Sequence, residues 1–130
     1  MIEQLLTNRT IEGFQIAENA HCWIVMNGGY VIGCGSLLRY VGSDGAFFTN
    51  EDHGHKFGLP APYDSQAEIE SRIKTKVIES VELTRSTGDL TLRLGDARIE
   101  ILCTSLGYEN WQLDGPEGFL LIDRSQRQHG

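Results

Sequence analysis

The sequence predicts an α+β domain that is mostly β. In it, two pseudo-repeated antiparallel strand–hairpin units pack as a sandwich or partly open barrel, with one helix between the halves. Apolar residues mostly alternate with polar ones, the period of half-buried strands, and only residues 65–77 have helical spacing. The chain has 130 residues, which fits one domain. We expect residues 1–122 to form this β-rich domain and residues 123–130 to be a flexible tail.

The first half begins with a short strand at residues 13–17, followed by a hairpin over residues 22–34. The hairpin turn at residues 27–29 reads Asn-Gly-Gly, a strong turn signal because its central positions need a positive φ. Trp23 points away from Ile24, and both are apolar. We therefore expect a central strand that is covered on both faces.

Residues 42–64 are rich in Gly, Asn, Asp and Pro, which predicts a long, mostly irregular excursion with one short strand at residues 46–48. The helix that follows is expected to start at an N-cap on Ser65. Glu68 lies three residues later, at the capping-box spacing. Two isoleucines four residues apart give this helix one apolar stripe.

Period-two alternation returns in the second half. It predicts a strand at residues 80–84, a hairpin over residues 89–103 and a strand, a turn and a strand over residues 111–122. Trp111 alternates with Leu113 onto the face expected to be buried, where an indole contributes most to a core.

The two hairpin segments, residues 11–36 and 78–103, resemble each other at an offset of 67 residues, which also separates Gly28 from Gly95. We interpret them as an internal repeat whose two apolar faces close on each other. At this offset the gap-free alignment pairs Val25 with Leu92, Ile32 with Ile99, and Cys34 with Ile101.

The composition is acidic, with 18 Asp and Glu against 11 Lys and Arg and a formal net charge of −7. Such a surface repels phosphate backbones, so we expect no nucleic-acid partner. It suits a basic protein partner, although the same charge also serves solubility alone. We find no signal peptide, no apolar run of about 20 residues and no paired-cysteine motif. These features predict a cytoplasmic protein with reduced thiols and no membrane contact.

Chemical motifs are scarce. His53 and His55 are weak candidate metal ligands, because His-x-His can place two imidazoles on one side of an extended chain. A cupin site would add a nearby Glu and a downstream His, and "KFGLPAP" follows instead. There is no Gly-x-Ser-x-Gly motif and no phosphate-binding loop, and the three cysteines lie in apolar strands. We therefore expect no catalytic residues, no bound metal and no cofactor.

A resemblance covers residues 6–122. The chain resembles a family of small bacterial β-rich domains of unknown function, some of which look like relatives of immunity proteins from toxin systems. The family signature is Tyr-Glu-x-Trp-x-x-x-Gly-Pro-x-Gly, matched here by Tyr108, Glu109, Trp111, Gly115, Pro116 and Gly118. The first half also contains a family-like "NRTI" at residues 8–11. The resemblance implies a structural hairpin at this signature and brings no biochemical role.

Taken together, these features favour a non-enzymatic, immunity-like protein-interaction module of a bacterial cytoplasm. The candidate interaction surface is Glu51, Asp52, Tyr108 and Glu109. Glu109 is open to two interpretations, as part of the hairpin or of a functional surface. Two alternatives stay open for the protein: a β barrel that binds a metal or small molecule, and a self-associating accessory domain that forms a homodimer.

Overall fold

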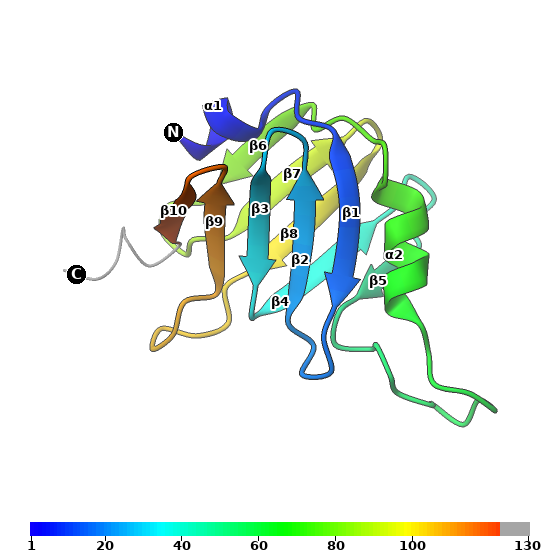
Figure 1. The fold of residues 1–130 in the computed structure, drawn as a ribbon. Helices are drawn as coiled ribbons and strands as arrows, with labels where there is room; N and C mark the ends of the chain where they lie inside the picture. The colour runs from blue at the N-terminus through cyan, green and yellow to red at the C-terminus, as the bar shows by residue number, and fades with distance from the viewer. Residues whose placement is uncertain (123–130) are drawn as a thin grey trace.

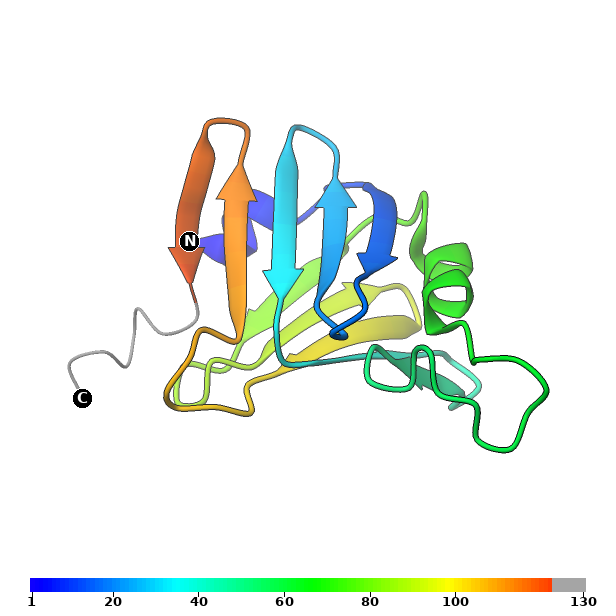
Figure 2. The same cartoon turned by 60° about the horizontal axis from the view of Figure 1, so that its bottom comes forward.

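Two five-stranded antiparallel sheets stack face to face in the computed structural model, which describes residues 1–122 (Figures 1 and 2). The first sheet has the order β1-β2-β3-β9-β10 and the second has the order β5-β4-β8-β7-β6. The elements are α1 (Ile2–Leu6), β1 (Ile11–Ile16), β2 (Cys22–Met26), β3 (Tyr30–Cys34), β4 (Leu37–Val41), β5 (Phe47–Thr49), α2 (Ser65–Ile73), β6 (Ser80–Leu83), β7 (Leu90–Leu94), β8 (Ala97–Leu102), β9 (Trp111–Gly115) and β10 (Gly118–Ile122). The predicted fold class is confirmed, with α2 between the halves. The predicted tail lies outside the described residues.

The N-cap of α2 is Asp64 and not Ser65, so that prediction is wrong by one residue. The Asp64 carboxylate accepts the Ala67 amide hydrogen at 3.0 Å, and its charge interacts favourably with the helix N-terminus. Glu68 does not complete a capping box, because its carboxylate pairs with Arg72 at 2.8 Å. The helix ends at Ile73, earlier than predicted.

Sequence analysis did not predict α1 or β4. After β3 the chain turns at Gly35 and the buried Ser36, and β4 continues into the second sheet between β5 and β8. The chain thus crosses from one sheet to the other within two residues.

The core fills the space between the inner faces of the two sheets. Trp111 is 1% exposed, so its predicted place in the core is confirmed. Its indole N–H donates to the backbone oxygen of Gly88 at 2.8 Å, which satisfies the one polar group that this side chain buries.

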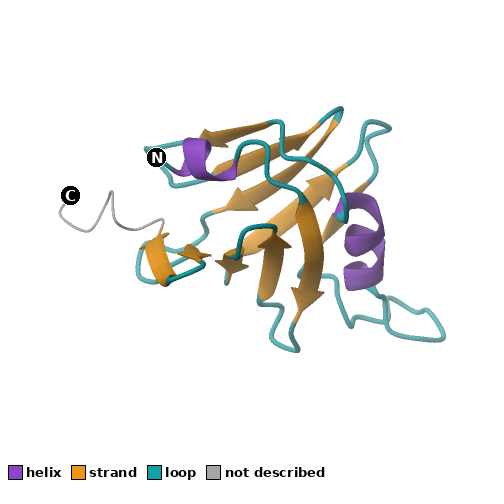
Figure 3. Ribbon diagram, turned by 45° about the horizontal axis from the view of Figure 1, so that its top comes forward, coloured by secondary structure: helices purple, strands orange, loops and turns teal. Residues whose placement is uncertain are grey.

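Each sheet combines strands from both halves of the chain. The first sheet takes β1, β2 and β3 from the first half and β9 and β10 from the second, and the second sheet takes β6, β7 and β8 with β4 and β5. In each half, one helix precedes five strands. Figure 3 shows the helices in purple and the strands in orange. The halves meet at an antiparallel bridge between Thr10 and Val77, which are 67 residues apart.

The contacts beside this bridge are reciprocal. The Asn8 amide donates to the Ile78 oxygen at 2.7 Å, and the Thr75 amide donates to the Ile11 oxygen at 2.8 Å. Asn8 and Thr75 both have a φ of 73°, a left-handed conformation that only Ala20 and Phe57 share among the other non-glycine residues described. Such reciprocity is what a twofold relation between the halves generates. The internal repeat of residues 11–36 and 78–103 stays a prediction.

The gap-free alignment of the two hairpins is wrong by one residue in β2. Val25 is half-exposed, whereas Leu92 is buried. The residue of the first hairpin that is equivalent to Leu92 is Ile24, which is also buried. The reason lies in the turns. Three residues join the paired ends of β2 and β3, and two residues join those of β7 and β8.

Candidate interaction face

The outer face of the first sheet carries no covering element within residues 1–122 (Figures 1 and 2). Helix α2 lies beside the edge strand β1. Trp23 on this outer face is 37% exposed, and Val25 and Val31 are half-exposed. The prediction that this strand is covered on both faces is therefore wrong. Its apolar outer residues face solvent because no other segment within residues 1–122 folds over them.

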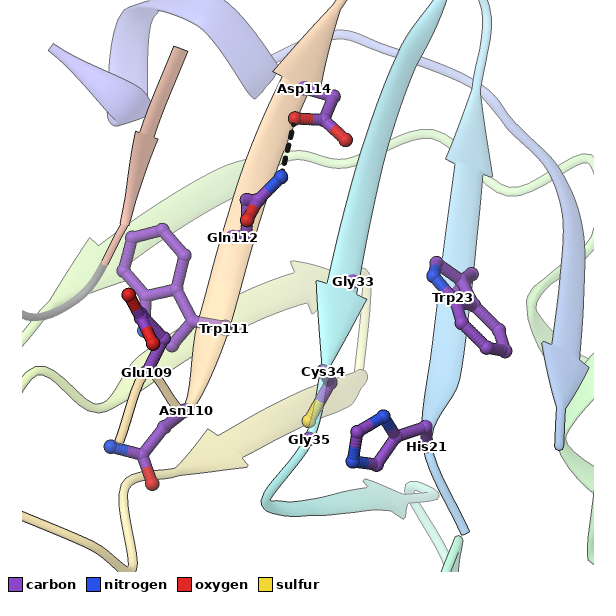
Figure 4. Close-up of a pocket in the computed structure, with 10 residues that line it drawn as sticks. All are labelled: His21, Trp23, Gly33, Cys34, Gly35, Glu109, Asn110, Trp111, Gln112 and Asp114. Atoms are coloured by element: carbon purple, nitrogen blue, oxygen red, sulfur yellow. Dashed lines mark hydrogen bonds between the residues drawn. The ribbon is translucent and has the colours of Figure 1, made fainter. Parts of the chain in front are cut away.

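A depression of about 220 Å³ crosses this face over β3 (Figure 4). Gly33 and Gly35 form its floor, and we call it the Gly33 trough. His21 and Trp23 lie on the β2 side, and a second group lies on the β9 side (Figure 4). That second group includes Glu109, Gln112 and Asp114.

The glycines of the trough are needed for space. A methyl group on Gly33 would lie 3.3 Å from the Trp23 indole, and one on Gly35 would lie 3.2 Å from the His21 ring. Both distances are tighter than ordinary van der Waals contact between carbon atoms. Any larger residue at either position would displace the aromatic rings that form this side of the trough.

The segments that form the first sheet carry acidic residues and no basic ones, and the Arg9 guanidinium, from just before β1, lies 4.1 Å from the centre of the Tyr30 ring at the start of β3. Residues 10–38 and 103–122 supply all five strands of the first sheet and contain no Lys or Arg. The same segments contain five acidic residues: Glu12, Glu18, Glu109, Asp114 and Glu117. The ion pairs described within residues 1–122 involve neither Glu109 nor Asp114. Asp114 accepts a hydrogen bond from the Gln112 side-chain nitrogen at 2.8 Å (Figure 4).

Asn110 fixes the loop that brings Glu109 to the trough. Its side chain is 2% exposed, and its Oδ1 accepts the amide hydrogens of Thr104 at 2.8 Å and Ser105 at 3.1 Å. The buried indole of Trp111 anchors the next residue. Within the matched signature, Trp111 is thus structural, whereas Glu109 is exposed at the rim of the trough.

The four residues of the predicted interaction surface fall into two groups. Glu51 and Asp52 lie on the loop between β5 and α2, and Tyr108 and Glu109 lie on the loop between β8 and β9. These loops are at opposite ends of the molecule in both views (Figures 1 and 2). Tyr108 is 77% exposed and does not line the trough.

The two candidate metal ligands lie in separate surroundings. His53 Nδ1 accepts the Gln66 amide hydrogen at 3.4 Å, and the His55 ring stacks on Phe57 with 5.5 Å between ring centroids. Among residues 1–122, no three His, Cys, Asp or Glu side chains are grouped as metal ligands.

Cys22 and Cys34 face each other across β2 and β3 and are buried in the core. The hydrogen bond with Cys34, followed by burial, raises the pKa of the Cys22 thiol far above its usual range. A thiol held in this protonated form is a poor nucleophile.

In comparisons with known proteins, no family model, no curated protein and no solved structure matches this chain. The resemblance to the signature-bearing bacterial family stays a prediction. None of the helices within residues 1–122 has the length and apolar character that a membrane crossing requires.

The sequence contains two signals that could have identified the trough. One is the absence of Lys and Arg from residues 10–38 and 103–122. The other is the Gly-Cys-Gly sequence at residues 33–35, in which both glycines alternate onto the face that also holds Trp23. The pairing of β3 with β9, which brings Asp114 to this face, could not be predicted from local pattern.

Proposed function

We propose that this chain is a non-enzymatic protein-interaction module that binds a basic protein partner through the outer face of the first sheet. The observation that carries the proposal is the exposed Trp23 on an uncovered face whose strands contain acidic residues and no Lys or Arg. The finer form of the proposal is an immunity-like protein of a bacterial cytoplasm that covers a basic site on a toxin.

The chemistry of the face supports a protein partner. Tryptophan is among the residues that dominate binding energy at protein interfaces, because it buries a large area with little loss of side-chain freedom. Carboxylates around it would attract a basic surface and raise the association rate more than the affinity. The trough is also smaller than the roughly 300–1,000 Å³ of most small-molecule pockets, which favours a side chain as its occupant.

A second candidate function is self-association through β10. This strand is at the edge of the first sheet, and Phe119 and Leu120 on it are 60% and 44% exposed. Exposed apolar residues on an edge strand favour pairing with another chain. A concentration-dependent dimer that is lost in Phe119→Lys would support this candidate.

Affinity capture from cells that express the protein naturally, followed by measured association rates, tests the main proposal. We expect a basic protein whose association slows as salt rises, since the Debye length falls from about 10 Å at 0.1 M to about 3 Å at 1 M. Trp23→Ala should remove most of the binding. Phe47→Ala is the matched control, because Phe47 is a 58% exposed aromatic residue on the second sheet. Equal loss in both variants, or binding without salt dependence, would contradict the proposal.

A further inference from the structure

Arginine side chains in this structure recur between an aromatic ring and a carboxylate. The Arg72 guanidinium lies 4.5 Å from the centre of the Phe48 ring and 2.8 Å from the Glu68 carboxylate. Arg39 lies 5.9 Å from the centre of the Phe47 ring and 2.7 Å from the carboxylate of Glu100. Each of these two rings thus has a cation with a carboxylate partner, whereas Arg9, 4.1 Å from the centre of the Tyr30 ring, has none among the ion pairs described within residues 1–122. Such pairs are favourable because the ring face is electron-rich and the carboxylate is charged.

The Gly33 trough has the ring and the carboxylates but no cation among residues 1–122. Trp23 supplies an indole, the aromatic group that binds cations best, and the edge of this ring nearest Gly33 carries Cδ1 and Nε1. Glu109 and Asp114 line the same depression, and neither takes part in the ion pairs described within these residues. The nearest strands cannot supply the missing group, because they contain no Lys or Arg.

The shape of the trough favours a flat group. Its floor has no side chains at Gly33 and Gly35, and the Trp23 and His21 rings approach these glycines from the β2 side, so the room for a planar group lies between these rings and the β9 side. A guanidinium is planar, stacks on aromatic rings and pairs with a carboxylate through two parallel hydrogen bonds. A lysine ammonium is compact and strongly hydrated, and it uses neither the flat floor nor the paired geometry.

From these observations we infer that the Gly33 trough is a binding site for the arginine side chain of a partner protein, with the guanidinium beside Trp23 and between Asp114 and Glu109, which lie at opposite ends of the trough (Figure 4). The inference rests on the proposed function for the identity of the occupant, since it assigns the side chain by which the basic partner would be recognised. The trough itself can be tested without that partner.

The test is an NMR titration with N-acetylarginine amide. Trp23 and Trp111 are the two tryptophans of the chain, so the spectrum contains two indole N–H signals. The signal that disappears in Trp23→Phe belongs to Trp23, and the other belongs to Trp111. We expect the Trp23 signal to move with an affinity in the millimolar range. The Trp111 signal should stay in place, because its N–H is held in the core by Gly88. N-acetylcitrulline amide, which has the same shape without the charge, should bind at least about threefold more weakly.

Two variants locate the site. Gly33→Ala should abolish the shift, since the added methyl group would press on the indole. Gly13→Ala is its matched control in the same sheet, where a methyl group would have its nearest neighbour at 3.9 Å. A Glu109→Gln, Asp114→Asn double variant should bind about fivefold more weakly, as expected for the loss of two exposed ion pairs. An unchanged Trp111 signal in each variant shows that the fold is intact.

Equal binding of the citrulline and arginine amides, or full binding by Gly33→Ala, would overturn the inference. So would a Trp23 signal that does not move. If the Trp23 signal does not move but the captured partner still depends on Trp23, the inference fails and the proposed function stands. If the arginine amide binds as described but no basic partner exists, the proposed function fails and the trough remains a guanidinium site.

Discussion

The outer faces of the two sheets differ at equivalent places in the strand order. The place compared in each sheet is a row of three residues that pair across three neighbouring strands. In the first sheet the row is Trp23, Gly33 and Gln112. In the second sheet the row is Thr91, Glu100 and Arg39. The same place in the same strand order is thus an open trough in one sheet and a salt bridge in the other.

In the second-sheet row, the charged side chains form ion pairs with one another and with a neighbouring arginine. Glu100 receives Arg39 at 2.7 Å and Arg98 at 2.9 Å. Partial burial alone would raise the pKa of Glu100, but the hydrogen bonds from the two arginines outweigh it, so the pKa lies below its usual range. The comparison teaches that the second-sheet row pairs its charged side chains with one another, whereas Glu109 and Asp114 beside the first-sheet row join none of the ion pairs described within residues 1–122.

The largest effect should come from separating the halves. Each sheet needs strands from both, so a chain cut between Tyr63 and Asp64 should give two fragments, neither of which folds as a monomer. An equimolar mixture should regain the dispersed amide spectrum of the intact chain. If either fragment alone were a monomer with cooperative thermal unfolding, strands from both halves would not be required for folding.

The two tryptophans of the first sheet should differ strongly in their effect on stability. Trp111→Ala empties a buried site and should lower the free energy of unfolding by about 3–5 kcal/mol. Trp23→Ala on the outer face should change it by less than about 1 kcal/mol. Urea denaturation of both variants measures the difference. Similar losses would mean that Trp23 supports the fold and is not reserved for binding.

A smaller loss is expected for Glu100→Gln. The variant removes the charge that two arginines share, which should cost about 1–2 kcal/mol at neutral pH. Glu82→Gln is the matched control, because Glu82 is 58% exposed and meets only Arg93 among the ion pairs described. Its cost should stay below about 1 kcal/mol. Equal losses in the free energy of unfolding for the two variants would show that Glu100 contributes no more than a single exposed ion pair.

The difference between wild type and Glu100→Gln should depend on pH. Because the folded-state pKa of Glu100 is lowered, the carboxylate contributes its full stability above its unfolded pKa of about 4.3. This contribution is lost as pH falls through the lower folded pKa. Urea midpoints of the two proteins should therefore converge in acid and separate toward neutral pH. A constant gap from neutral to strongly acidic pH would show that the charge is not its cause.

The predictable parts of the fold were those set by short-range pattern. Alternation and turn residues predicted the hairpins, and the place of Trp111 in the core followed from its parity with Leu113. The N-cap prediction is wrong because Ser65 and Asp64 are both capping residues, and the sequence does not determine which side-chain oxygen reaches the Ala67 amide. Strand β4 was missed because its sequence, "LLRYV", lacks a clean alternation.

The candidate site was only partly predictable. Glu109 was singled out from its sequence context, but its neighbours Trp23 and Asp114 come from strands far apart in the chain. Trp23 itself was expected to be covered, since an apolar residue in a central strand usually is. Whether a sheet face is covered depends on the path of the whole chain and not on the strand that carries the residue.

The central claim is that the first-sheet row is kept open for a partner. It is tested most directly by building the second-sheet row into the first sheet, with the double variant Gly33→Glu, Gln112→Arg. These positions pair directly across β3 and β9, as Glu100 and Arg39 pair across β8 and β4. The measured quantity is the affinity of this variant for the captured basic partner, relative to wild type.

The control exchanges an existing pair on the second sheet, Glu82→Arg with Arg93→Glu, which alters that face but keeps its ion pair. We predict that the first-sheet variant unfolds like wild type but loses at least about tenfold in affinity, as removal of a central tryptophan contact would. The control should bind like wild type. Undiminished binding by the first-sheet variant, or loss of binding in the control, would contradict the account.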